Sequence, residues 1–134
     1  TDFAVTKALE QEPLEVLFLG AWGSRWDHTL ANVHLLERLL HAGVSGVMQN
    51  AWNRMQLVRP GLLTVAKGHY TYLSLLAWTE VVKGITLSGF RFPLVDATLA
   101  RKSSLAISNE WMKEVGTVSH EVGELLVIQS RDPY

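Results

Sequence analysis

The segment from Trp22 to His28 holds the densest group of chemically versatile side chains in this sequence. It reads Trp-Gly-Ser-Arg-Trp-Asp-His. An aspartate beside a histidine can exchange protons with a substrate, and a nearby serine can act as a nucleophile. The candidate catalytic residues of this segment are Ser24, Asp27 and His28. Its candidate binding residues, which could hold an anion or stack on a ring, are Trp22, Gly23, Arg25 and Trp26.

The glycine spacing of this segment does not match the known phosphate-binding motifs. Gly20 and Gly23 lack the third glycine of a dinucleotide fingerprint, and no lysine follows as in a phosphate-binding loop. Ser24 also lacks the flanking glycines of a nucleophile elbow. A purely structural interpretation therefore stays open. In that interpretation Asp27 caps a helix and the tryptophans pack the helix onto a sheet.

Two further histidines complete the candidate catalytic residues. His69 follows a turn and has no obvious partner in the neighbouring sequence. His120 alternates with Val118 and Val122 in a predicted strand, so its side chain should share their face. We therefore expect His120 to lie in the core or in an interface.

A possible metal-binding trio lies on one helical face. His34 and His41 are seven residues apart, with Glu37 between them. Histidine ligands on one helix usually stand three or four residues apart, so this spacing favours a solvated Glu–His pair. The sequence therefore predicts no metal site, and no motif indicates a cofactor.

The elements around the Trp22–His28 segment are the clearest in the chain. Residues 14–19 form a short apolar run that predicts a buried strand. Residues 28–42 place Leu30, Val33, Leu36 and Leu40 at helical spacing. The segment thus follows a strand and precedes a helix, which is where ligands bind in open α/β sheets.

The rest of the chain predicts alternating elements. We expect helices at 2–10, 45–58, 71–83 and 97–115. A strand at 44–48 is an alternative within the second, and a break near Ser108-Asn109 is an alternative for the last. We expect strands at 62–66, 85–92, 117–122 and 125–129, the last two joined by a tight hairpin at Gly123-Glu124. The predicted fold is α/β or α+β. It is one compact domain over 1–134, with a mixed sheet of about four to five strands flanked by helices.

Composition excludes several classes of protein. With 48% hydrophobic and 19% charged residues, the chain is not intrinsically disordered. The formal charge is −1 and the basic residues are scattered, which argues against nucleic acid as a partner. No apolar run reaches the length of a membrane span. The absence of cysteine excludes disulfides and thiol catalysis, and it favours a cytoplasmic location.

The apolar content, including five tryptophans, is high for a chain of 134 residues. The excess indicates apolar surface buried against another molecule, most simply a second copy of this chain, although a well-filled monomer core is the alternative. With no recognised catalytic motif, the sequence predicts a non-enzymatic, homodimeric assembly factor that binds other proteins of a larger complex. The alternative is a small-ligand-binding α/β enzyme with its site in the loop Trp22–His28.

Overall fold

The computed structural model describes all residues from 1 to 134 and contains two helices and ten strands. Their order is α1 (Asp2–Leu9), β1 (Glu15–Leu19), α2 (Trp26–His41), β2 (Ser45–Gln49), β3 (Asn53–Val58), β4 (Gly61–Ala66), β5 (Tyr72–Ala77), β6 (Val81–Ser88), β7 (Ala97–Ala100), β8 (Asn109–Glu110), β9 (Val115–His120) and β10 (Leu125–Ser130). No helix is long and apolar enough to cross a membrane.

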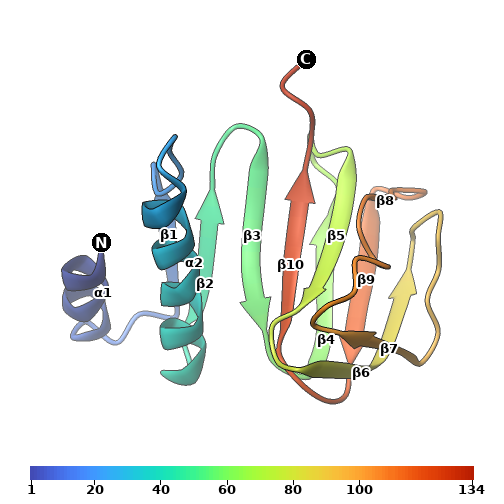
Figure 1. The fold of residues 1–134 in the computed structure, drawn as a ribbon, viewed down its shortest axis with the longest axis horizontal. Coiled ribbons are helices and arrows are strands. Elements are labelled where there is room, and N and C mark those ends of the chain that lie inside the picture. Colours follow the sequence, from blue (N-terminus) through green and yellow to red (C-terminus); the bar gives the residue numbers. More distant parts are fainter.

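The strands form two sheets, which makes this a mostly-sheet α+β fold. The larger sheet has six strands in the order β1-β2-β3-β10-β5-β8, and the smaller has four in the order β4-β9-β6-β7. Figure 1 shows the larger sheet running across the molecule from α2 to the strands at the right. The predicted mixed sheet of about four to five strands is therefore only loosely matched.

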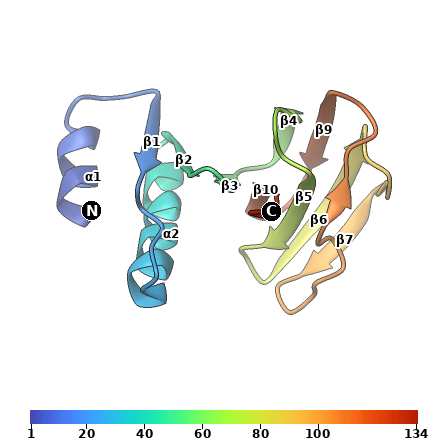
Figure 2. The same cartoon turned by 90° about the horizontal axis from the view of Figure 1, so that it is seen from above.

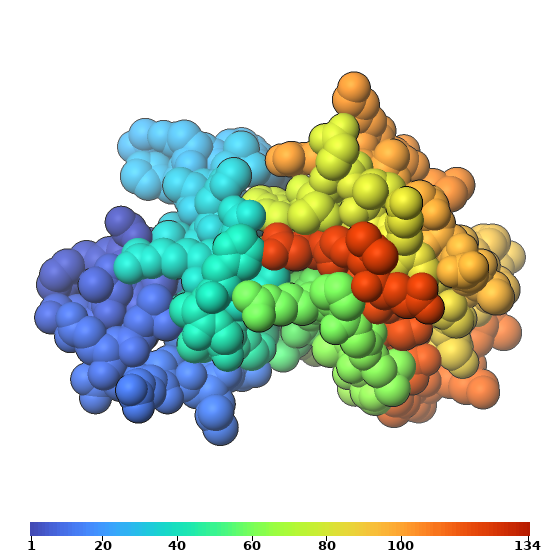
Figure 3. Space-filling view, turned by 90° about the horizontal axis from the view of Figure 1, so that it is seen from below, coloured from blue at the N-terminus to red at the C-terminus, as the bar shows by residue number.

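The N-terminal part of the chain forms a strand–helix–strand unit. β1 and β2 pair in parallel, and α2 connects them. Two parallel strands need such a crossover, because the chain leaves the first strand at one end of the sheet and must enter the second at the other end. Figure 2 shows α1, β1, α2 and β2 together on one side of the molecule, and Figure 3 shows them as one bulge. The loop after β1 therefore lies beside the start of α2.

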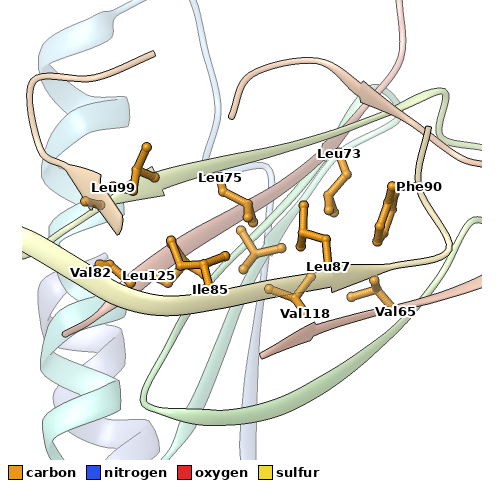
Figure 4. Packing of buried hydrophobic residues seen from close by; sticks show 12 residues of the cluster. Val65, Leu73, Leu75, Val82, Ile85, Leu87, Phe90, Leu99, Val118 and Leu125 are labelled. Atoms are coloured by element: carbon orange, nitrogen blue, oxygen red, sulfur yellow. The ribbon is translucent and has the colours of Figure 1, made fainter. Parts of the chain in front are cut away.

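From β3 onward the chain passes repeatedly from one sheet to the other. Only β6 and β7 are consecutive strands of the same sheet. The facing sheets enclose a core that includes Leu73, Leu75, Ile85, Val118 and Leu125, all fully buried (Figure 4). Burying one such side chain contributes about 1.5–3 kcal/mol. This sandwich forms the second bulge in Figure 3.

A second core lies between α2 and the opposite face of the larger sheet. Leu36 and Leu39 of α2 pack there with Met48, Met55 and Leu126 of the strands. Residues of β10 therefore alternate between the two cores: Leu125 and Val127 face the sandwich, and Leu126 faces α2. Strands covered on both faces have near-continuous apolar sequences.

This double burial explains why the predicted helix at 71–83 is wrong. Residues 72–77 form β5 and residues 81–88 form β6. Leu75 faces the sandwich core, while Leu76 packs against the core beside α2. A strand buried on both faces and a buried helix have the same apolar pattern, so periodicity could not separate them.

The predicted helices at 45–58 and 97–115 are also strands. Residues 45–58 form β2 and β3, because the Asn50 side chain accepts hydrogen bonds from the backbone of Trp52 and Asn53 and turns the chain. The alternative of a strand near 44–48 is confirmed. Residues 97–115 hold β7, β8 and the first residue of β9, and the rest of the range is irregular loop.

Other predicted elements agree with the structure. The helices at 2–10 and 28–42 and the strands at 14–19, 62–66, 117–122 and 125–129 are present with shifted ends, and the strand at 85–92 overlaps β6. The tight hairpin at Gly123-Glu124 is wrong. β9 and β10 do not pair with each other, because β9 belongs to the smaller sheet and β10 to the larger.

Candidate functional site

The loop between β1 and α2 is fastened to the first turns of the helix. The Asn32 side chain donates a hydrogen bond to the Ala21 carbonyl at 2.9 Å, and the Gly23 backbone N–H donates to the Thr29 hydroxyl at 3.4 Å. The Thr29 hydroxyl in turn donates to the Arg25 carbonyl at 3.3 Å. These bonds hold the loop over the N-terminus of α2, where backbone N–H groups and the helix dipole favour an anion.

Asp27 pairs with Arg25 and does not cap the helix. Arg25 Nη2 lies 2.6 Å from Asp27 Oδ2 and Nε lies 3.3 Å from Oδ1. The Arg25 guanidinium holds the pKa of Asp27 below its ordinary value. The N-cap position of α2 is Arg25, without a side-chain hydrogen bond. The predicted capping role of Asp27 is therefore wrong, because its carboxylate lies in the first turn and turns back to Arg25.

The remaining side chains of the loop and of the first turn of α2 face solvent, except for Trp22. Ser24 and His28 are exposed, and so is Trp26, whereas Trp22 is half-buried against the core beside α2. No hydrogen bond joins the side chains of Ser24, Asp27 and His28 to one another. The arrangement offers a cation and a helix N-terminus to an anion, and it does not show a nucleophile held by a base.

His120 is a structural histidine, as its alternation with Val118 predicted. Its side chain is buried, and its Nε2–H donates to the Gly123 carbonyl at 2.9 Å. Burial lowers the pKa of His120 below its ordinary value of 6.5, although the bond to Gly123 opposes part of this shift. The ring is neutral at neutral pH and fixes the turn that leads into β10.

His69 lies on the β4–β5 loop, where its ring stands 4.2 Å from that of Tyr70. Both line an open hollow of about 440 Å³, together with Lys67, Tyr72 and Trp111 among others. The Tyr70 hydroxyl and Trp111 Nε1 are buried without a hydrogen-bond partner, and burial raises the pKa of Tyr70. His28, His69 and His120 lie on different elements, so the structure does not unite the predicted catalytic residues.

A smaller hollow of about 270 Å³ lies between the loops on either side of β7. Its lining is almost entirely apolar and consists of Phe92, Leu94, Leu105, Ala106, Ile107 and Asn109. Phe92 as a whole is 56% exposed, and the Arg91 guanidinium lies 5.4 Å from the centroid of its ring. Apolar hollows with a few fixed polar groups are the usual form of small-molecule sites.

Asn109 fixes the shape of this hollow. Its buried side-chain amide donates to the Phe92 carbonyl at 2.7 Å and accepts from the Phe92 backbone N–H at 3.0 Å. The preceding residue, Ser108, has a φ of +59°, and its backbone N–H donates to the Ser74 hydroxyl at 2.9 Å. Strained backbone of this kind persists where surrounding contacts enforce it, and it is common at functional sites.

Sequence analysis missed this hollow, because the predicted helix at 97–115 ran through it. The available signal was the pair Ser108-Asn109, at which a break of that helix was the alternative prediction. Asparagine is a poor helix residue, and both residue types favour turns in which the side chain bonds to the backbone. The partner of Asn109, Phe92, lies 17 residues earlier in the chain. Only the tertiary structure reveals that contact.

Comparison with known proteins gives a consistent result. Residues 62–125, which include the whole apolar hollow, match the family model described as thiamin pyrophosphokinase, vitamin B1 binding domain. The chain is 33% identical over 132 residues to the thiamine pyrophosphokinase of Bacillus subtilis (strain 168). That alignment covers 98% of this chain and 62% of the relative. The chain therefore spans less than two thirds of the curated relative that it matches.

Solved structures show the same similarity. Thiamine pyrophosphokinase from Bacillus subtilis superimposes with a TM-score of 0.94 at 32% identity, covering 98% of this chain and 62% of that one. Thiamin pyrophosphokinase from Geobacillus thermodenitrificans gives 0.88 at 36% identity, covering 98% and 60%. Both alignments extend beyond residues 62–125 and include the β1–α2 loop.

These comparisons contradict the prediction of a non-enzymatic assembly factor or structural protein, because the proteins that resemble this chain are named as kinases. The prediction rested on the absence of a recognised motif and on the apolar content. The structure places much of that apolar content inside two cores. The alternative prediction of a small-ligand-binding enzyme is better supported. In sequence and in fold, this chain is similar to thiamine pyrophosphokinases along nearly its whole length.

Proposed function

We propose that this chain binds thiamine and takes part in transferring a pyrophosphoryl group to it. One observation carries the proposal. The segment that matches the vitamin B1 binding model contains an apolar hollow of about 270 Å³ whose wall is fixed by a buried asparagine and a strained serine. A cytoplasmic location, expected from the sequence, is part of the same proposal.

The chemistry of the hollow suits thiamine. Thiamine joins an aminopyrimidine ring to a positively charged thiazolium ring. In this proposal one of the thiamine rings stacks on Phe92, which is 56% exposed and has the Arg91 guanidinium 5.4 Å from its ring centroid. The apolar side chains of Leu94 and Ile107 complete the lining. In this proposal Asn109 positions Phe92 and does not itself contact the ligand, because its amide is engaged by the Phe92 backbone.

The β1–α2 loop is the part of this chain best suited to hold phosphate groups. The N-terminus of α2 and the guanidinium of Arg25 both favour an anion at this point. Asp27 occupies Arg25 in the structure, so a phosphate would compete with the Asp27 carboxylate for the guanidinium. This role uses the predicted binding residues Gly23 and Arg25, and it assigns no nucleophile to Ser24.

The two proposed subsites lie in different parts of the molecule. Figure 1 places the blue loop after β1 at the left and the gold and orange segments around β7 at the right, with β3 and β10 between them. One copy of the chain therefore does not bring its own loop to its own hollow. A homodimer in which each copy completes the other's site would do so, and this supports the predicted self-association.

Thiamine titration calorimetry on this chain tests the proposal. We expect Phe92→Ala to weaken thiamine binding about tenfold or more, since stacking on an aromatic ring and burial of its face are both lost. Phe3→Ala is the matched control. Phe3 is also an exposed phenylalanine, lies on α1 and should leave thiamine affinity unchanged.

Two results would contradict the proposal. One is no heat of binding at millimolar thiamine for a chain whose circular dichroism shows it to be folded. The other is equal affinity of Phe92→Ala and Phe3→Ala. In the second case thiamine would bind elsewhere, and the hollow of about 440 Å³ near His69 would be the next place to test.

A further inference from the structure

Three ligand-type side chains meet where α2 approaches the sandwich. Glu37 and His41 lie one turn apart on α2, and Glu124 lies in the turn that leads from β9 to β10. The donor atoms of these residues all lie within 4.8 Å of one another. In Figure 1 the end of α2 and the start of β10 both lie at the lower edge of the molecule.

This trio differs from the one that the sequence suggested. His34 is turned away and packs edge-on against Trp78, with ring centroids 5.2 Å apart. Its place beside Glu37 and His41 is taken by Glu124, 83 residues after His41. The spacing of seven residues between His34 and His41 argued against a metal site on this helix. That argument does not apply to Glu37, His41 and Glu124, because His34 is not among them.

Glu124 is held firmly. Its backbone N–H donates to the Thr79 hydroxyl at 3.0 Å, and its carbonyl accepts from the Trp78 N–H at 2.9 Å. Its side chain is 16% exposed, whereas the His41 side chain is 53% exposed. The group therefore combines a largely buried carboxylate, carried on a fixed backbone, with an imidazole that a dissolved ion can reach.

The charges in this group are unbalanced. None of the ion pairs in the structure joins Glu37 or Glu124 to a lysine or arginine, and the one partner of Glu124 is His41 Nε2 at 2.5 Å. The group also lies at the C-terminal end of α2, where the last carbonyl groups add partial negative charge. Two carboxylates and a helix C-terminus together attract a cation.

We propose that Glu37, His41 and Glu124 form a binding site for a divalent transition-metal cation, best matched by Zn²⁺. One imidazole nitrogen with two carboxylate oxygens is a donor set that zinc accepts, and three protein ligands leave a position for water. The imidazole argues against Mg²⁺, which prefers oxygen ligands and keeps its water shell. Bound zinc would link α2 to the turn before β10 and so join the two bulges of the molecule.

Titration of the metal-free chain with zinc chloride tests this site, with calorimetry and thermal unfolding as readouts. We expect one zinc per chain and a rise in Tm, because an ion that binds only the folded state stabilises it. Magnesium chloride should give neither effect at the same concentration. Neither readout depends on thiamine, so failure here would leave the proposed function intact.

Matched variants assign the ligands. Glu124→Gln and His41→Asn should each weaken zinc binding at least about tenfold and abolish the rise in Tm. Glu80→Gln and His69→Asn change the same residue types at exposed positions outside the group, and they should bind zinc as the parent chain does. Glu37→Gln should also weaken binding, and it removes no hydrogen bond that the fold uses.

Several results would overturn the site. One is the absence of heat and of a Tm shift at about 100 µM zinc, well above the dissociation constants of built zinc sites. Another is equal zinc affinity in Glu124→Gln and Glu80→Gln. If circular dichroism showed Glu124→Gln or His41→Asn to be unfolded, Glu37→Gln would decide, and unchanged zinc binding by that variant would reject the proposal.

Discussion

Individual residues of the β1–α2 loop show how local contacts decide chemical roles. Asp27 and His28 are adjacent in sequence and were predicted to act as an acid/base pair. In the structure the Asp27 carboxylate turns to Arg25, which lowers its pKa and makes it a poor proton acceptor. An anion that binds at Arg25 would therefore have to compete with the Asp27 carboxylate, which lies 2.6 Å from the guanidinium.

His120 allows a prediction about pH and stability. Burial lowers its pKa, so between pH 6.5 and the lower folded value the unfolded chain binds more protons than the folded chain. The free energy of unfolding should therefore fall as the pH drops below 6.5. One proton that binds only the unfolded chain gives a slope of at most about 1.4 kcal/mol per pH unit, and we expect a fraction of that slope. We expect His120→Gln to flatten this slope in denaturant titrations between pH 7 and pH 5.

The matched control is His69→Gln, which removes an exposed histidine. This variant should keep the slope of the parent chain over the same pH range. If His120→Gln and His69→Gln gave the same slope, the pH dependence would come from other groups, and the burial of His120 would not be its cause.

At the scale of elements, the passage of the chain between sheets explains the incorrect assignments. β5 and β10 are central strands with apolar side chains on both faces, and that pattern also suits a buried helix. The turn between β9 and β10 carries the chain from one sheet to the other. Gly123 makes that passage possible, with a φ of +91° and no room for a Cβ beside the Val81 carbonyl.

We therefore predict that Gly123→Ala destabilises the fold by about 2–4 kcal/mol. An added Cβ would lie 2.5 Å from the Val81 carbonyl oxygen and would also have to adopt a positive φ. Gly68→Ala is the control, since Gly68 also has a positive φ, of +53°, but open space around it. It should cost only about 1 kcal/mol. Equal losses in chemical denaturation would show that the close contact is unimportant.

At the scale of the whole molecule, the main question is how the β1–α2 loop and the apolar hollow could act together. They belong to different bulges, which are joined through β3 and β10 of the shared sheet (Figures 1 and 3). Several large apolar side chains are exposed on the sandwich, among them Leu62, Leu105 and Met112. Single exposed apolar side chains are common on protein surfaces, and they mark an interface where they form one contiguous patch.

These features lead to a prediction about mass in solution. Light scattering on a sizing column should give twice the chain mass of 15.0 kDa, and the value should persist on dilution to low micromolar concentration. Leu62→Glu or Met112→Glu should shift the mass toward the monomer if the interface includes that position. A monomer at every concentration would contradict the predicted homodimer and would require another way to unite the two subsites.

The sequence by itself determined the elements whose signals are local. The helix at 28–42 has a clear apolar stripe, the strand at 14–19 is a short apolar run, and His120 alternates with valines, so each could be predicted from neighbouring residues. The segment Trp22–His28 was placed correctly after a strand, but the helix begins at Trp26, so its last three residues form the first helical turn. Its binding and catalytic roles stay predictions.

Only the tertiary structure decided the features that depend on distant contacts. It showed that residues 71–83 are strands, because their apolar faces meet two different cores. It showed that the hydrogen bond from Asn109 to Phe92 shapes the apolar hollow. It also showed that the side chain beside His41 is Glu124 and not His34. The physical reason is the same in each case. Hydrogen bonds and burial act between side chains that are close in space, and their separation along this chain reaches 83 residues.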